Sequence, residues 1–205
     1  MSTNLPYLRK FLIKFSSTLV GLFTVFSMIA LFSIWSLNRA YQHSQEDSQR
    51  IRDLADEALV SQINFKIQVQ EWKNILLRGD IQSTRNQYYE AFILRSQDVE
   101  NHLMSIIDKT VALGLNELQS EAQDLLEEHK RIFLEYQSSL KSIPNLSFET
   151  ARKIDKKLIG IDRDLEARLT VLSQKILDLN ISRREQYNTV FHEHYLTLRM
   201  LLLIS

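Results

Sequence analysis

The sequence predicts an all-α protein in which an N-terminal transmembrane helix continues into an antiparallel, up-down-up-down four-helix bundle. Three observations lead to this fold class. Glycine and proline are rare, with 4 Gly and 2 Pro among 205 residues, so long helices are favoured over sheets. Residues 15–37 contain no charged side chain. Beyond them, apolar residues recur at alternating spacings of three and four, which is typical of a helical packing seam.

The uncharged segment 15–37 is long enough to cross a bilayer, because about 20 apolar residues span the hydrocarbon core as a helix. Three basic side chains precede it, Arg9, Lys10 and Lys14. Positive charge is concentrated on the cytoplasmic side of membrane helices, so we expect residues 1–14 in the cytoplasm and the bundle outside. A cleaved signal peptide is the alternative, but its cleavage site needs small residues, whereas Phe32, Ile34 and Trp35 are bulky.

Strong breakers divide the rest of the chain into four helical segments. The breakers are Gly79, the stretch Gly114–Asn116, and Pro144. The helices of the sensor domain 38–195 are therefore predicted at about 38–78, 83–113, 116–142 and 147–195. Short connections make consecutive helices antiparallel.

The last predicted helix, 147–195, has a clear beginning and an open end. Ser147 is a good N-cap, and Glu149 is favourable in the first turn near the positive end of the helix dipole. Gly160 lies inside this helix, at a cost of about 1 kcal/mol relative to Ala. Residues 196–205 turn sharply apolar, and we expect a second transmembrane helix to start there and be cut short. A natural end that dips into the membrane surface is the alternative.

Composition argues against several functional classes. The absence of cysteine excludes a disulfide framework and CxxC metal sites. No basic stripe supports nucleic-acid binding. His129 lies on the seam of the third helix and His102 borders that of the second, yet the Glu-x-x-His spacing of a bundle metal site is missing. We therefore expect no metal, cofactor or catalytic group, and no enzyme.

A longer string of residues resembles a known family. The stretch Phe65-Lys-Ile-Gln-Val-Gln-Glu-Trp-Lys-Asn-Ile-Leu-Leu-Arg-Gly79 resembles the end of the first sensor helix in bacterial methyl-accepting chemotaxis proteins with an extracytoplasmic four-helix bundle. The step Gly160–Arg163 is also similar, and the likeness covers about residues 10–200. It implies a dimeric sensor domain in the bacterial inner membrane, with the bundle in the periplasm. The methylation sites and the kinase-contacting hairpin of that family are absent from this chain.

One polar stripe is a candidate ligand site. Lys66, Gln70 and Lys73 recur at i, i+4 and i+7 and so share one face of the first helix. In related receptors, polar residues at this height bind small ligands near the dimer interface, and two ammonium groups could hold a carboxylate. The simpler interpretation, which the sequence alone favours, is a solvent-exposed helix face.

Asp162 and Arg163 are candidates to close the same pocket. Counting from the start of the last helix places them level with residues 62–66 of the first. An exposed ion pair is the simpler interpretation, and it contributes less than about 1 kcal/mol.

These observations favour the ligand-sensing module of a transmembrane chemotaxis or signal-transduction receptor, which transmits binding as a helix displacement. The expected partners are a second copy of the chain, membrane lipid, and a small molecule or a periplasmic binding protein. A membrane-anchored coiled-coil scaffold without a ligand is the alternative. The sensor part of a membrane-bound cyclase or histidine kinase is another.

Overall fold

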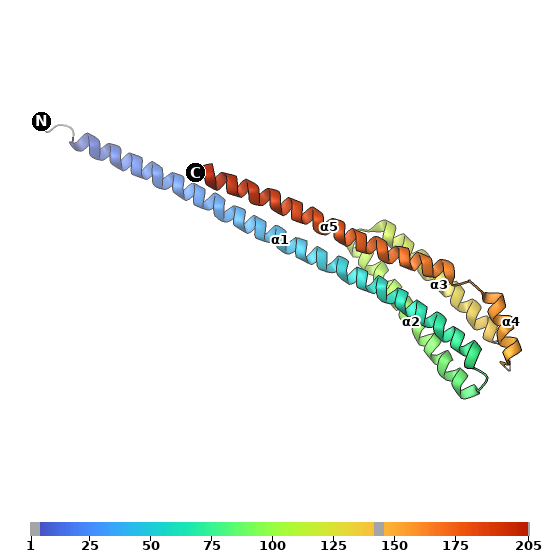
Figure 1. Ribbon diagram of the computed structural model, residues 1–205. Coiled ribbons are helices and arrows are strands. Elements are labelled where there is room, and N and C mark those ends of the chain that lie inside the picture. The colour runs from blue at the N-terminus through green and yellow to red at the C-terminus, as the bar shows by residue number, and fades with distance from the viewer. Residues whose placement is uncertain (1–4, 142–145, 205) are drawn as a thin grey trace. The chain divides into compact units, whose positions relative to one another are not determined.

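The structure is a computed structural model that describes residues 5–141 and 146–204. Over these ranges the chain forms helices and no strand, which confirms the all-α class. The helices are α1 (Leu5–Arg78), α2 (Gln82–Leu113), α3 (Asn116–Lys141), α4 (Phe148–Leu158) and α5 (Arg163–Ile204) (Figure 1). Pro144 lies outside the described residues.

The chain divides into two units, which we describe separately. One comprises residues 1–47 and 184–205, and the other comprises residues 48–183. Both α1 and α5 pass from one unit into the other. The predicted continuity of the apolar N-terminal segment with the first bundle helix is therefore present in α1.

The first unit contains the apolar part of α1 and the end of α5. α1 is the helix of the described residues that is long and apolar enough to cross a membrane, with a mean hydropathy of 2.0 over a window that contains no buried residue. Its two threonine hydroxyls are satisfied within the helix, since Thr18 donates to the carbonyl of Lys14 and Thr24 to that of Val20. Such internal pairing is what a hydrocarbon environment requires.

Two contacts mark the polar end of this apolar segment. The guanidinium of Arg39 lies 5.5 Å from the ring centre of Trp35, within the range of a cation–π contact. Further along, the Tyr187 hydroxyl donates to Asp47 at 2.9 Å. This hydrogen bond joins α1 to α5 within the first unit.

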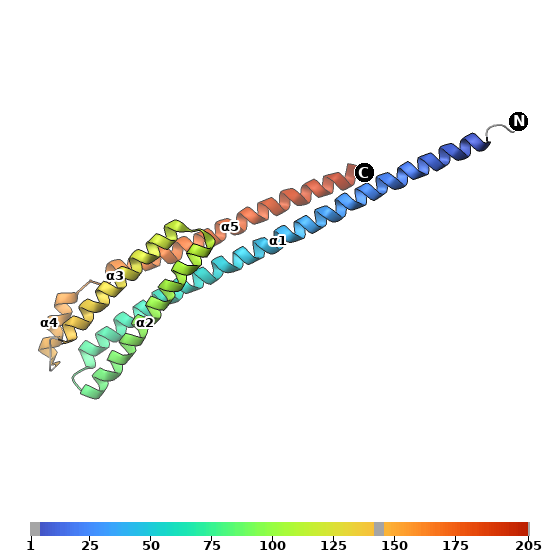
Figure 2. The same cartoon turned by 180° about the vertical axis from the view of Figure 1, so that it is seen from behind.

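The second unit has one hydrophobic core to which all five helices contribute. Its largest fully buried side chains include Phe65, Phe92 and Tyr136. The rings of Trp72 and Tyr136 lie 4.5 Å apart, and that of Phe92 lies 5.5 Å from Phe133. Trp72 is buried as well. Figure 2 shows the turn after α1 and the short helix α4 at the same end of this unit.

The predicted helix 147–195 is not continuous. Ser147 is its N-cap as expected, since the side chain accepts a hydrogen bond from the backbone N–H of Thr150. The helix then ends at Leu158, and α5 begins at Arg163. Gly160 between them has φ = 79°, a left-handed conformation that glycine adopts without steric cost. Gly160 is therefore the break itself, and the prediction of an interior helical glycine was wrong.

Candidate functional site

Lys66 faces α5. Its Nζ lies 3.5 Å from Oε1 of Glu166, and both side chains are about half exposed. One turn away, Gln62 donates to the Thr170 hydroxyl at 2.6 Å. An ion pair this exposed contributes about 0–1 kcal/mol, and the carboxylate offsets part of the charge that Lys66 offers to an anion.

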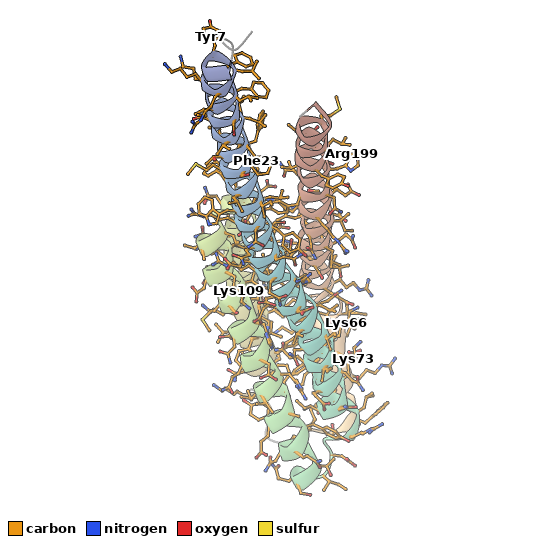
Figure 3. The ribbon with its side chains drawn as sticks, turned by 90° about the vertical axis from the view of Figure 1, so that its left-hand side faces the viewer. Tyr7, Phe23, Lys66, Lys73, Lys109 and Arg199 are labelled. Atoms are coloured by element: carbon orange, nitrogen blue, oxygen red, sulfur yellow. The ribbon has the colours of Figure 1, made fainter. Side chains whose placement is uncertain are left out.

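The three polar residues of the α1 stripe share a face, as predicted. Figure 3 shows Lys66 and Lys73 on the same side of α1. Gln70 lies between them, and all three side chains are exposed. The stripe is therefore accessible to a solute or to a partner protein.

The other two candidates, Asp162 and Arg163, lie level with a part of α1 that is nearer its C-terminal end than the sequence predicted. The pairs 62–170 and 66–166 show that α5 runs antiparallel to α1, so residues 162 and 163 lie level with about residue 70, and not with 62–66. Counting along a continuous helix from Ser147 does not give the right level, because the helix is interrupted between Leu158 and Arg163. The structure brings Asp162 and Arg163 beside the Gln70 level of the stripe.

Asp162 and Arg163 also have contacts of their own. Burial, and then the negative charge of Asp162, raise the pKa of Tyr136, so this carboxylate acts on α3. The Arg163 side chain folds over the break, where its Cδ lies 3.4 Å from the position of a β-carbon on Gly160. Arg163 therefore packs over the α4–α5 break, and both residues border the candidate stripe.

A cluster of partly buried polar side chains around Glu57 was not predicted. Its carboxylate lies 2.6 Å from Nδ1 of His102, and it accepts hydrogen bonds from the Ser105 hydroxyl at 3.0 Å and the Lys109 ammonium at 2.6 Å. Burial by itself raises the pKa of Glu57, but the hydrogen bonds from Lys109, His102 and Ser105 outweigh it and lower the pKa. The cluster ties α1 to α2; Lys109 is labelled in Figure 3.

The spacing of these α2 residues carried a signal for the cluster. His102, Ser105 and Lys109 are three and four residues apart, which places three donors on one helix face. The spacing does not identify the hydrogen-bond acceptor, because Glu57 becomes a neighbour of these residues only when α1 packs on α2. His102 is therefore paired with a carboxylate at the rim of the core.

His129 is fully buried in the core, as its seam position predicts. Its Nε2 lies 2.9 Å from Oε1 of Gln68, while Nδ1 has no hydrogen-bond partner among the described residues. Burial, with a smaller effect from Lys130, lowers the pKa of His129 to about 4. The imidazole is therefore neutral at pH 7, and the 3.7 Å approach of Glu100 to Nδ1 is not an ion pair at that pH.

Within the described ranges, no three histidine, aspartate or glutamate side chains gather as a metal site. The polar contacts described above instead connect helices. Glu57 joins α1 to α2, Gln68 joins it to α3, and Lys66 joins it to α5. All of these contacts involve α1, the helix that also contains the apolar segment.

The fold and these contacts define a class: an all-helical protein in which a packed helical unit is continuous with a helix able to cross a membrane. The chain is 29% identical over 152 residues, 73% of its length, to the methyl-accepting chemotaxis protein CtpH of Pseudomonas aeruginosa. It spans about a quarter of that relative's length. No family model matches the sequence, and no solved structure matches it.

Proposed function

We propose that this chain is the membrane-anchored, ligand-sensing module of a chemoreceptor-related signalling protein of the bacterial inner membrane. The observation that carries the proposal is the similarity to a methyl-accepting chemotaxis protein over 73% of the chain. The apolar segment of α1 supports the membrane anchor. The basic residues before that segment favour a periplasmic position for the unit formed by residues 48–183.

The proposed mechanism is a displacement of one helix relative to its neighbours. We propose that α1, α2, α3 and the pair α4–α5 act as an antiparallel four-helix bundle. Both α1 and α5 leave this unit and enter the other, so a shift of either helix is carried along a rigid element. Helix shifts of about 1–2 Å are an established form of signal transmission.

The α1 stripe is the proposed contact for a carboxylate-bearing small molecule or for a periplasmic binding protein. A ligand that binds only the folded state stabilises it by about 2.7 kcal/mol at a hundred times its dissociation constant. We expect a thermal-shift screen of amino acids and organic acids on the whole chain in detergent to find such a ligand. The variant Lys66→Gln/Lys73→Gln is expected to lose most of the stabilisation.

A matched control keeps the net charge change the same. Lys156→Gln/Lys157→Gln removes two exposed lysines from α4 and should leave the ligand-induced shift unchanged. If no compound in the screen stabilises the protein, the scaffold hypothesis replaces the sensor. Equal losses in both double variants would assign the effect to net charge and not to the stripe.

A homodimer is the proposed assembly, because a row of apolar side chains is exposed on α1. Leu59 and Ile63 lie one turn apart and are each about half exposed, and Ile67 continues the row. We expect Ile63→Cys to form disulfide-linked dimers on mild oxidation in native membranes, since the chain has no other cysteine. Leu134→Cys, on an exposed position of α3, is the control and should cross-link several-fold less. Similar yields at both positions would contradict an α1 interface.

A further inference from the structure

A small cavity lies at the end of the second unit where α2 begins and α3 ends. Its volume is about 220 Å³, below the usual range for drug-sized ligands. Side chains from the first two turns of α2, from the last turns of α3 and Leu146 line it. None of the α1 stripe residues is among them. Figure 2 shows this end of the unit, with the turn before α2.

The cavity is positively charged. Arg85 and Lys141 both line it, and no described lining residue is acidic. Neither cation forms an ion pair with a described carboxylate; the Arg85 guanidinium donates instead to the amide oxygen of Gln82. The first turn of α2 carries no acidic residue either, and its N-cap residue, Ile81, forms no side-chain capping bond. Lys141 lies in the last turn of α3, whose negative end offsets part of its charge, whereas Arg85 lies near the positive end of α2 and attracts an anion there.

The remaining lining residues favour an anion with an apolar body. Leu140 and Leu146 supply the apolar wall, and Leu146 is buried. Gln137 donates to the Tyr89 hydroxyl at 3.3 Å, so one pair of neutral polar groups is already partly satisfied. An inorganic anion would leave the leucine side unused, whereas a short branched carboxylate contacts both the leucines and the cations.

We propose that this cavity binds a small organic carboxylate with a short apolar chain, held by Arg85 and Lys141 against Leu140 and Leu146. The proposal deepens the sensing function proposed above and rests on it for its biological role, while the binding itself is testable alone. Charge-assisted hydrogen bonds from the guanidinium are the strongest contacts available there. The site is separate from the α1 stripe.

Leu146 connects the cavity to the turn that follows α1. A β-carbon on Gly79, at the end of α1, would lie 3.0 Å from Cδ2 of Leu146, so the leucine packs against the turn that follows α1. Leu146 also directly precedes the N-cap of α4. A ligand that contacts Leu146 therefore acts on the turn after α1, one of the two helices that the proposed mechanism moves, and on the start of α4.

The test is isothermal titration calorimetry on the whole chain in detergent micelles, with isovalerate as the probe. Its neutral isostere isovaleramide serves as the control ligand. We expect saturable binding of isovalerate and at least about tenfold weaker binding of isovaleramide, as expected for the loss of a charged hydrogen bond. Arg85→Gln and Lys141→Gln should each weaken isovalerate binding about tenfold, with an unchanged circular dichroism spectrum.

Lys156→Gln removes an exposed lysine of α4 that does not line the cavity; it is the matched control and should bind isovalerate as the unaltered chain does. The proposal is overturned if isovalerate shows no saturable binding, if isovaleramide binds equally well, or if the two cavity variants bind normally. Binding that is lost only in the α1 stripe variant Lys66→Gln/Lys73→Gln overturns this site and leaves the sensing function standing. Binding that depends on Arg85 supports this site even where the α1 stripe binds nothing.

Discussion

Replacing Phe92 with alanine is expected to lower the free energy of unfolding of the second unit by about 3–5 kcal/mol. Phe92 has an exposed fraction of 0%, and its ring contacts those of Trp72, Phe133 and Tyr136. Truncation removes the transfer free energy of the ring and leaves a cavity that three neighbouring aromatic side chains cannot fill without leaving their rotamers. Denaturant unfolding of the whole chain, followed by circular dichroism, measures the loss.

The same substitution at Phe148 is the control. Phe148 has an exposed fraction of 82%, so Phe148→Ala should change the free energy of unfolding by less than about 0.5 kcal/mol. A large loss at both positions would mean that Phe148 is covered by a partner. Little loss at Phe92 would contradict the packing of α2 against α1 and α3.

The helix boundaries follow from local chemistry, which explains why the sequence predicts them well. The ends at Arg78, Leu113 and Lys141 lie within two residues of the predicted ends. Gly114 caps α2 in the left-handed conformation, with its N–H bonded to the carbonyl of Val111, as glycine after a helix normally does. The spacing of apolar residues likewise predicts Leu54, Phe65 and other core positions, because it records which face of a helix is buried.

The break at Gly160 could not be read from that spacing. Leu158, Ile161 and Leu165 follow the three-four pattern straight through it, and the structure packs all three against the core. The turn between α4 and α5 still directs these apolar side chains towards the core, so their spacing looks the same as in an uninterrupted helix. The glycine itself was the signal, since its φ of 79° strains any other residue.

Contacts between helices were the least predictable part of the site. The α1 stripe was predictable because its residues belong to one helix, and their relative positions follow from helical geometry. The Glu57 cluster and the level of Asp162 depend on how far one helix slides along another, and that distance is determined by side-chain packing across the whole interface. Sequence spacing within each helix leaves this axial position open.

Acidification is expected to destabilise the second unit through His129. In the folded state the pKa of His129 is lowered to about 4 from an ordinary value of 6.5, so between these pH values the unfolded chain binds a proton that the folded chain does not. Stability is then fully present above pH 6.5 and falls as the pH drops towards 4. A pKa difference of this size corresponds to about 3 kcal/mol.

The surroundings of His129 explain why a proton is excluded. Gln68 and the ring of Phe65 contact it from α1, and Lys130 is its neighbour on α3. Among the described residues, Glu100 on α2 is the one carboxylate within 4 Å of the ring nitrogens. At 3.7 Å from Nδ1 it is beyond hydrogen-bonding distance, so it compensates only part of the cost of burying a charge. Protonation would also leave a second N–H donor in the core without a partner.

His129→Gln isolates this effect, because glutamine does not titrate and can still donate to Gln68. We expect this variant to lose most of the fall in unfolding free energy between pH 7 and pH 4, as measured by denaturant unfolding at a series of pH values. His192→Gln removes an exposed histidine and should keep the fall. Both variants keep the same carboxylates, so a difference between the two curves of unfolding free energy against pH is assigned to His129. Coinciding curves would show that the pKa of the buried imidazole is not lowered.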